Sequence, residues 1–363
     1  MHDAAAPLRA ALIGYGYAGK TFHAPLLVAV PGWELACVAS SRPDAVHADL
    51  PGMRIVADPL QAIAQDGIDL VVIATPNAQH APLAEAALRA GKHVVVDKPF
   101  TLDLAEARRL RASARQAGRV LSVFHNRRWD SDFLGMQRLI DGGRLGQVVH
   151  FESHFDRFRP QVRDRWRERA QAGGGIWFDL GPHLADQALQ LFGLPLDVHA
   201  DITALRPGAQ ADDWAHVVLR YDRLRVVLHA GMLVAGGSAR FTVHGTRGSA
   251  VKQSPDRQEA QLLAGMRPGD PGWGVDDDPL QLFSGAGPAE TVASAAGDQR
   301  RFYAGLRDAI HAGTPAPVTD AQALAVMAVL EAGIASSRNG CTAALLLTDE
   351  ERDAFARARR AAA

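Results

Sequence analysis

Cysteine, aromatic residues and net charge are all scarce in this chain of 363 residues. Its two cysteines, Cys37 and Cys341, show no metal-binding or paired spacing, which favours a reducing cytoplasm over a disulfide-rich compartment. A net charge of −1 gives no positive field for nucleic acid. No apolar run reaches about 18 residues, and no signal-peptide pattern opens the chain. We therefore expect a cytoplasmic protein that contacts neither nucleic acid nor membrane.

The first third of the chain alternates short apolar strands with helical segments. The runs at 8–13, 35–39, 69–74, 93–96 and 119–124 are largely apolar, as strands buried on both faces of a parallel sheet are. Helix signals fall between these runs; Asp103 with Glu106 forms a capping-box-like start, and Gly118 can end that helix. The alternation predicts an α/β domain with a parallel sheet over residues 1–126.

Beyond residue 126 the strand signals follow one another. A helix at about 132–141, a strand at 148–156 and a helix at about 179–192 precede strands at 198–204, 214–221, 225–230 and 240–244. This order favours an α+β domain over 127–345, with an open, mostly antiparallel sheet and helices on one side. We expect residues 254–297 to form irregular surface structure, and we expect two helices, at 298–312 and 320–337, to follow. We treat 346–363 as a C-terminal tail, either a solvated helix or frayed.

The most informative motif is Gly14-Tyr-Gly-Tyr-Ala-Gly19, which joins the first strand to a helix. Its first glycine permits a tight turn, its second lets a pyrophosphate approach the backbone, and its third lets the helix pack on the strand. The phosphates would meet the unpaired N–H groups and positive end of that helix. In this strand–helix context the motif predicts a Rossmann domain that binds a dinucleotide through Gly14, Gly16, Tyr17 and Gly19.

The end of the second strand bears on the choice between NAD and NADP. An acidic residue there would bind the ribose hydroxyls of NAD and repel a 2′-phosphate. This chain instead has Ser40-Ser41-Arg42, whose hydroxyls and guanidinium suit a phosphate. We therefore favour NADP, and Asp44, two residues further on, leaves NAD possible.

Three residues have the chemistry of a hydride-transfer site. Lys98 follows the strand 93–96, and ligands of open α/β sheets lie beyond such strand ends. Asp179 and His183 are four residues apart on a predicted helix, with Gly181-Pro182 between them in what we expect to be its first turn. A histidine can take a hydroxyl proton near neutral pH while a carboxylate orients it. The alternatives are a surface lysine paired with Asp97 and a purely structural Asp–His pair.

Four segments together resemble one family over nearly the whole chain: the glycine motif, Ala74-Thr-Pro-Asn77 with His80, Ala90-Gly-Lys-His-Val-Val-Val-Asp-Lys-Pro99, and Gly175-Ile-Trp-Phe-Asp-Leu-Gly-Pro-His183. They are similar to those of the Gfo/Idh/MocA oxidoreductases, with Asp97 in place of the usual Glu. The segments 20–25, 124–130 and 154–160 resemble those of the NADP-dependent scyllo-inositol dehydrogenase branch of this family.

The resemblance implies an NADP-dependent dehydrogenase that oxidises a hydroxyl of a cyclic polyol or sugar, with scyllo-inositol the substrate that the narrower likeness suggests. Lys98, Asp179 and His183 would be catalytic, with His183 the general acid/base. Further cofactor contacts are implied, some by a weaker likeness, at Thr75, Pro76, Asn77, His80, Asp97, Lys98, Trp166 and Arg167. Substrate contacts are expected at Lys98, Asn126, Arg127, Asp156, Asp179 and His183.

Other readings stay open at this point. Some relatives hydrolyse glycosides through transient oxidation on bound NAD, and a non-catalytic dinucleotide sensor could use the same fold. His154, Asp156, Asp179 and His183 could form a metal cluster, but no compact metal motif is present and we expect no metal. The open sheet needs cover, so we expect a homodimer or homotetramer.

Overall fold

The computed structural model describes residues 6–362 and divides the chain into two compact units. Unit 1 comprises the described residues up to Asn126, together with Gln258–Trp273 and Asp298–Leu324. Unit 2 comprises Arg127–Arg257, Gly274–Gly297 and the described residues from Ala325 on. The chain first passes from unit 1 to unit 2 between Asn126 and Arg127. The expected linear scheme of 1–126, 127–345 and 346–363 omits the two later returns of the chain to unit 1.

Unit 1 is built on a six-stranded parallel sheet with the order β3-β2-β1-β4-β5-β6. The strands are β1 (Leu8–Ile13), β2 (Trp33–Ala39), β3 (Ile55–Val56), β4 (Leu70–Ile73), β5 (His93–Val96) and β6 (Leu121–Val123). All four residues of β4 are buried, because helices cover both faces of the sheet. The two-residue β3 was not expected, since so short a strand has no periodicity of its own.

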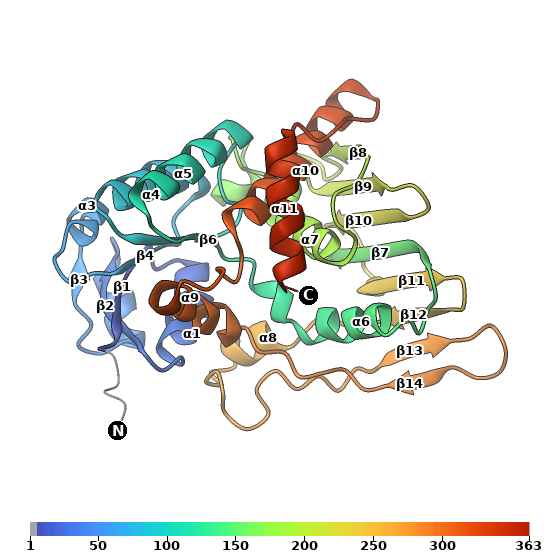
Figure 1. Ribbon diagram of the computed structural model, residues 1–363, viewed down its shortest axis with the longest axis horizontal. Coiled ribbons are helices and arrows are strands. Elements are labelled where there is room, and N and C mark those ends of the chain that lie inside the picture. Colours follow the sequence, from blue (N-terminus) through green and yellow to red (C-terminus); the bar gives the residue numbers. More distant parts are fainter. Residues whose placement is uncertain (1–5, 363) are drawn as a thin grey trace. The chain divides into compact units, whose positions relative to one another are not determined.

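The helices of unit 1 connect these strands. They are η1 (Gly19–His23), α1 (Ala24–Val28), α2 (Pro43–Asp49), α3 (Pro59–Ile63), η2 (Asn77–Gln79), α4 (His80–Arg89) and α5 (Leu104–Ala117), with α8 (Gln258–Leu263) and α9 (Arg300–Ala312) from the later segments. Figure 1 shows α4 and α5 on one side of the sheet and α1 and α9 on the other. Asp103 caps α5 through the amide of Glu106, and Gly118 ends that helix, as expected.

Unit 2 is built on an eight-stranded sheet with the order β14-β13-β12-β11-β7-β10-β9-β8. Its strands are β7 (Val148–Asp156), β8 (Asp197–Thr203), β9 (Trp214–Arg220), β10 (Arg225–Gly231), β11 (Phe241–Gly245), β12 (Gly248–Lys252), β13 (Leu280–Phe283) and β14 (Glu290–Val292). Neighbouring strands are antiparallel except β7 and β10, which are parallel. The predicted fold class is therefore confirmed: a parallel α/β domain and an α+β domain with a mostly antiparallel sheet.

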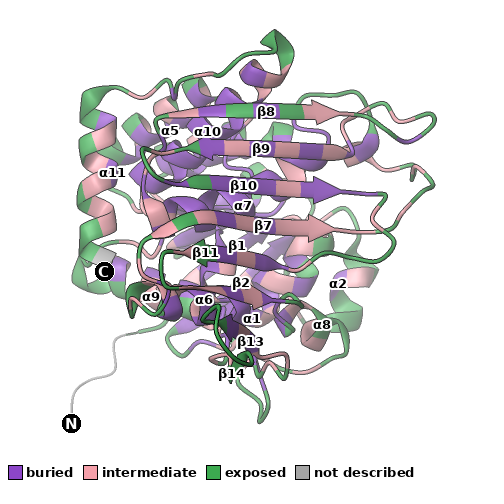
Figure 2. Cartoon of the chain, turned by 90° about the vertical axis from the view of Figure 1, so that its right-hand side faces the viewer, coloured by how far each residue is buried: buried purple, intermediate pink, exposed green. Residues whose placement is uncertain are grey.

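The helices of unit 2 leave one face of its sheet bare. They are η3 (Asn126–Trp129) at its start, α6 (Ser131–Asp141), η4 (Trp166–Glu168), α7 (Ile176–Phe192), α10 (Asp320–Asn339), which begins in unit 1, and α11 (Asp349–Ala362). In Figure 2, α7 and α10 lie behind the sheet, and no helix of the described part of unit 2 lies in front of β8, β9, β10 and β7. Side chains along these strands therefore alternate between the covered face and the bare face.

One expectation for the second half of the chain was wrong. Residues 254–297 contain α8, β13 and β14, so they are not merely irregular surface. Of the two alternatives for the C-terminal segment, the helix is present as α11. It is packed against the rest of unit 2, because Phe355 is buried and Arg359 donates hydrogen bonds to the carbonyls of Gln190 and Leu191. These carbonyls end α7, where a cation is favoured. Among residues 6–362, no helix is long and apolar enough to span a bilayer.

Candidate active site

The glycine loop of unit 1 has the three geometries that a dinucleotide motif requires. Gly14 has a φ of +96°, and a Cβ there would lie 2.6 Å from the carbonyl oxygen of Ala74. A Cβ at Gly19 would collide with the Gly14 carbonyl, whereas one at Gly16 would meet nothing within 4 Å. The first and third glycines are therefore needed for packing, and the second leaves open space beside the backbone. This space fits a pyrophosphate at the start of the helical segment 17–28.

Arg42 lies against this glycine loop. Its guanidinium donates a 2.9 Å hydrogen bond to the Tyr15 carbonyl, and its amide donates to the Ser40 hydroxyl at 3.0 Å. Ser41 and Arg42 are exposed at the carboxyl end of β2, and Ser40 is half-buried. Lys20, on the helical segment after the glycine loop, pairs with Asp49 of α2 at 2.8 Å. The local charge and donors fit the 2′-phosphate of NADP, while the carboxylate that would bind NAD ribose is absent from 40–42.

The loop after β4 carries Thr75, Pro76, Asn77 and His80, which the sequence predicts beside the cofactor. The His80 ring is buried and lies between two carbonyls, that of Pro99 at 2.8 Å and that of Thr75 at 3.0 Å. Burial lowers the pKa of His80, and a neutral ring donates to only one carbonyl at a time. His80 therefore joins the two loops and holds their positions. The Thr75 hydroxyl is buried and makes no hydrogen bond among the described residues, which leaves it available to a ligand.

Asp97 fixes the backbone that carries Lys98. Its carboxylate accepts a 2.9 Å hydrogen bond from the Lys98 amide and lies 3.7 Å from Nε2 of His23. Burial would raise the pKa of Asp97, but His23, Lys98 and His80 outweigh this effect and lower it. The Tyr303 hydroxyl lies 2.7 Å from Nδ1 of His23. A buried chain of polar groups thus supports the half-exposed Lys98 from below.

Helix α7 begins earlier than the sequence predicts. Gly175 precedes it with a φ of +91°, and a Cβ at Gly175 would collide with the carboxylate of Asp212. That carboxylate accepts a 2.8 Å hydrogen bond from the Trp177 amide, and the Asp212 carbonyl accepts one from the Ile176 amide at 2.8 Å. Asp212 therefore caps the helix from the chain segment before β9. As a result, Pro182 lies inside α7, and the expectation that it belongs to the first turn was wrong.

Asp179 and His183 lie on α7 four residues apart, so they share one face of the helix. Oδ1 of Asp179 lies 3.4 Å from Nε of Arg167. The Arg167 guanidinium lies over the ring of Trp166, 4.4 Å from its centroid. His183 is buried, with its ring centroid 6.3 Å from that of Phe155. Trp166, Arg167, Asp179 and His183 therefore belong to unit 2, where the structure brings Arg167 to Asp179.

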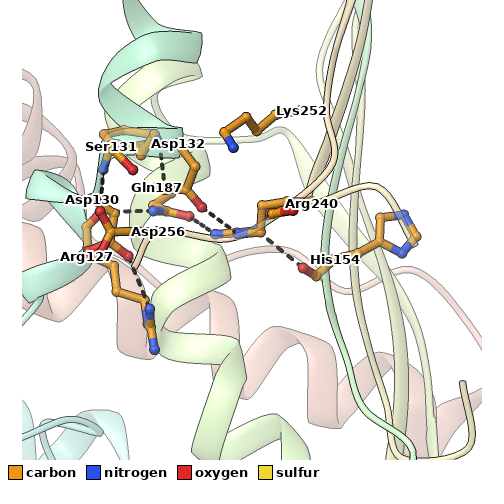
Figure 3. A network of polar contacts seen from close by, with 12 residues as sticks. Arg127, Asp130, Ser131, Asp132, His154, Gln187, Arg240, Lys252 and Asp256 are labelled. Atoms are coloured by element: carbon orange, nitrogen blue, oxygen red, sulfur yellow. Dashed lines mark hydrogen bonds and ion pairs between the residues drawn. The ribbon is translucent and has the colours of Figure 1, made fainter. Parts of the chain in front are cut away.

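Phe155, which lies near His183, is also contacted by Arg127 and Arg240. The guanidinium of Arg127 lies 5.0 Å from the Phe155 centroid, and that of Arg240 lies 3.9 Å from it. Figure 3 shows Arg240 among the polar side chains of α6 and α7, with hydrogen bonds to Asp132 at 3.0 Å and Gln187 at 2.6 Å. Burial lowers the pKa of Arg240 to about 10, against the raising effect of Asp132.

Two of the expected substrate residues make contacts within their own units. Asn126 is buried and donates a 2.9 Å hydrogen bond to Gln299 within unit 1. Asp156 follows Phe155 on β7, so its side chain lies on the opposite, bare face of the sheet. There it contacts His154 and His229 at 3.3 and 3.4 Å. The structure thus does not group Asp156 with Asp179 and His183, as the sequence interpretation does.

Several residues of these clusters were not found from the sequence. His23 and Tyr303 are 280 positions apart, and nothing in either segment signals their contact. Phe155 and Arg240 meet because β11 pairs with β7, a register that strand patterns alone do not reveal. Asp212 caps α7 from a segment 35 positions further along the chain, so it too lacks a local signal.

The comparisons with known proteins agree with this architecture. Residues 8–125 match the Gfo/Idh/MocA model described as "Oxidoreductase family, NAD-binding Rossmann fold". Residues 137–345 match its companion, "Oxidoreductase family, C-terminal alpha/beta domain". The chain belongs to the Gfo/Idh/MocA oxidoreductase family. As a Gfo/Idh/MocA protein it is an oxidoreductase with an NAD(P)-binding fold.

Relatives of this Gfo/Idh/MocA protein align along nearly its whole length. YdgJ of Escherichia coli K12, named an uncharacterized oxidoreductase, is 52% identical over 341 residues, covering 93% of this chain and 99% of YdgJ. IolW of Bacillus subtilis 168, named scyllo-inositol 2-dehydrogenase (NADP(+)), is 36% identical over 337 residues, covering 91% of this chain and 94% of IolW. A Klebsiella pneumoniae protein of known crystal structure is 55% identical, with a TM-score of 0.92 and coverage of 97% and 99%.

Proposed function

We propose that this chain is an NADP-dependent dehydrogenase that reversibly oxidises a secondary hydroxyl of a cyclic polyol, with scyllo-inositol the leading candidate. The observation that carries the substrate is its 36% identity with IolW over 94% of that enzyme. The residues of both units are compatible with this chemistry. Lys98 offers an ammonium at the end of β5, and α7 offers Asp179 and His183 on one helix face.

The proposed cofactor residues lie in unit 1. The open space beside Gly16 fits the pyrophosphate, and Ser40, Ser41 and Arg42 would hold the 2′-phosphate. Donors with a fixed charge are strong phosphate ligands, and the guanidinium already lies beside the glycine loop. When bound, NADP supplies the nicotinamide carbon that accepts the hydride.

The side chains of the protein would accept the hydroxyl proton and stabilise the charge that develops on the substrate oxygen. We assign His183 the role of general base, its imidazole taking the hydroxyl proton as the carbinol carbon becomes a carbonyl. We assign Lys98 the role of hydrogen-bond donor to the reacting oxygen of the substrate, and in the reverse direction that of polarising the carbonyl. Asp179, four residues before His183 on the same face of α7, would stabilise the imidazolium that forms. The buried Asp97 holds the Lys98 backbone.

Turnover and cofactor binding of three chains test these roles: the wild type, Lys98→Met and His183→Gln. Loss of a general base or of an oxygen-stabilising donor is expected to lower kcat by about 100-fold or more. Binding of NADPH, followed by fluorescence, is expected to change little. Wild-type turnover in either variant would remove that residue from the mechanism. Tightly bound NAD with hydrolysis of a glycoside and no net NADPH would instead favour the glycosidase alternative, and NADP binding with no turnover of any polyol would favour a sensor.

A further inference from the structure

A group of three side chains on the bare face of the unit 2 sheet has no part in the proposed hydride transfer. His154 and Asp156 lie on β7, and His229 lies opposite His154 on the neighbouring β10. Nδ1 of His154 lies 3.3 Å from one oxygen of Asp156, and Nε2 of His229 lies 3.4 Å from the other. In Figure 3 the ring of His154 points away from Arg240 and its partners Asp132 and Gln187, although the His154 carbonyl accepts a hydrogen bond from Arg240.

Asp156 has a buried carboxylate with few well-oriented hydrogen-bond donors around it. Its side chain is only 3% exposed. Within the described part of the chain, neither of its oxygens accepts a hydrogen bond of good geometry, and Nδ1 of His154 makes none either. Burial would raise the pKa of Asp156, but the side chains of His154 and Ser238 are close enough to help lower it. Burying an ionised carboxylate is costly unless a cation or several donors compensate it. When both histidines are neutral, the group therefore has no positive charge at the point where its three side chains converge.

The remaining ring nitrogens are already oriented by neighbours. Nε2 of His154 lies 3.0 Å from Glu152, and Nδ1 of His229 lies 3.4 Å from Nδ1 of His216. These contacts leave Nδ1 of His154 and Nε2 of His229 facing Asp156. A carboxylate on the far nitrogen of a histidine is the usual support for a metal-binding imidazole.

Gly231 keeps space open beside the group. It lies opposite Asp156 in the register of β7 and β10. A Cβ at this position would lie 3.3 Å from both Oδ1 of Asp156 and Nε2 of His229, which is tighter than ordinary carbon contacts. A side chain at 231 would therefore press on two of the three polar groups.

We propose that His154, Asp156 and His229 bind one divalent transition-metal ion of the zinc type. One atom from each residue lies within 4.8 Å of the others. Zinc–nitrogen and zinc–oxygen bonds of about 2.0–2.2 Å place tetrahedral ligands roughly 3.3–3.6 Å apart. The two histidine nitrogens lie 3.3 and 3.4 Å from different oxygens of Asp156, so binding of one ion through a single carboxylate oxygen requires a small movement of these side chains. Two imidazoles with one carboxylate suit zinc and exclude a site built for Mg²⁺ or Ca²⁺, which prefer oxygen ligands. The fourth position is left for water.

A proton can compensate the same charge when no metal is bound. Burial would lower the pKa of His154, but Asp156 and Glu152 outweigh this effect and raise it above its ordinary value. An imidazolium between two carboxylates is therefore the competing explanation of the cluster. The two explanations differ in one measurable property, because only the metal site binds Zn²⁺ stoichiometrically at micromolar concentration.

The test uses the full chain after treatment with a chelator. Calorimetric titration with Zn²⁺ is expected to show one ion bound per chain, and Co²⁺ is expected to give the intense visible absorption of tetrahedral coordination. Mg²⁺ is expected to give neither signal. Asp156→Asn and His229→Gln are expected to abolish binding, and Glu152→Gln is expected to weaken it by about 10- to 100-fold. His244→Gln is the matched control, since His244 is an exposed histidine of β11 that contacts Ser249.

Three results would overturn the assignment. They are no stoichiometric binding to the wild type, equal binding to the wild type and Asp156→Asn, or an octahedral cobalt spectrum. Metal-free thermal unfolding shows whether each variant is folded, and the cobalt spectrum of the wild type decides the matter even if a variant is not. Because zinc binding is measured without substrate or NADP, its failure leaves the proposed dehydrogenase activity untouched.

Discussion

Replacing Arg42 by Ala should weaken the use of NADP without affecting the use of NAD. The Arg42 guanidinium is exposed beside the glycine loop, held by one hydrogen bond to the Tyr15 carbonyl. A hydrogen bond to a charged group contributes about 1.5–3 kcal/mol. Since about 1.4 kcal/mol is a factor of ten, kcat/KM for NADP should fall roughly 10- to 150-fold. NAD has no 2′-phosphate, so its kcat/KM should change by no more than about twofold on the same scale.

The assay compares initial rates of reduced nicotinamide formation with each cofactor, at saturating polyol and fixed ionic strength. Arg89→Ala is the matched control, because Arg89 is an exposed arginine of α4 paired with Glu85, and its loss changes the net charge equally. The control should leave both cofactors unaffected. Equal losses with NADP and NAD in Arg42→Ala, or a wild-type preference for NAD that survives the substitution, would refute the assignment of the phosphate to Arg42.

Three further predictions concern the glycine loop and pH. Gly16→Ala should weaken NADPH binding while stability changes by less than about 0.5 kcal/mol, because a Cβ there meets no protein atom; unchanged affinity would argue against a phosphate at this glycine. Gly14→Ala should lower the free energy of unfolding by roughly 2–5 kcal/mol, since it combines a positive φ with a backbone collision. Denaturant unfolding measures the stability of both glycine variants. Burial, with a smaller effect of Arg119, lowers the pKa of His93 from 6.5 to about 4, and its neutral Nδ1 accepts from the Val120 amide. The unfolded chain takes up this proton first, so stability that is complete above pH 6.5 is lost as the pH falls toward 4. His93→Gln should remove about 1–2 kcal/mol of that dependence, after allowance for the partial exposure of the ring; an unchanged profile would contradict it.

Strong local signals predicted much of the fold. The strands β5 and β7 have the bounds that their apolar and alternating runs predict. The glycine loop joins β1 to a helix, as expected. Predicted helix boundaries were wrong where a residue distant in sequence decides them. Asp212 caps α7, which begins at Ile176 rather than at about 179.

The misses of the sequence interpretation have a common physical cause. The strands β12, β13 and β14 are short and contain or adjoin glycine and polar residues, so their pairing rather than their pattern makes them strands. The return of Gln258–Trp273 to unit 1 likewise depends on contacts made far along the chain. The partner of His154 was sought at Asp179 and His183, whereas the parallel register of β7 and β10 supplies His229.

The transfer of deuterium from substrate to cofactor tests the central claim most directly. Scyllo-inositol deuterated at its ring carbons is incubated with NADP and the purified chain, and the reduced cofactor is analysed by mass spectrometry. Direct hydride transfer from the carbinol carbon predicts one deuterium in each NADPH formed, and loss of that product in His183→Gln. Reduced cofactor without deuterium, or no reduced cofactor with any cyclic polyol, would contradict the proposed dehydrogenase.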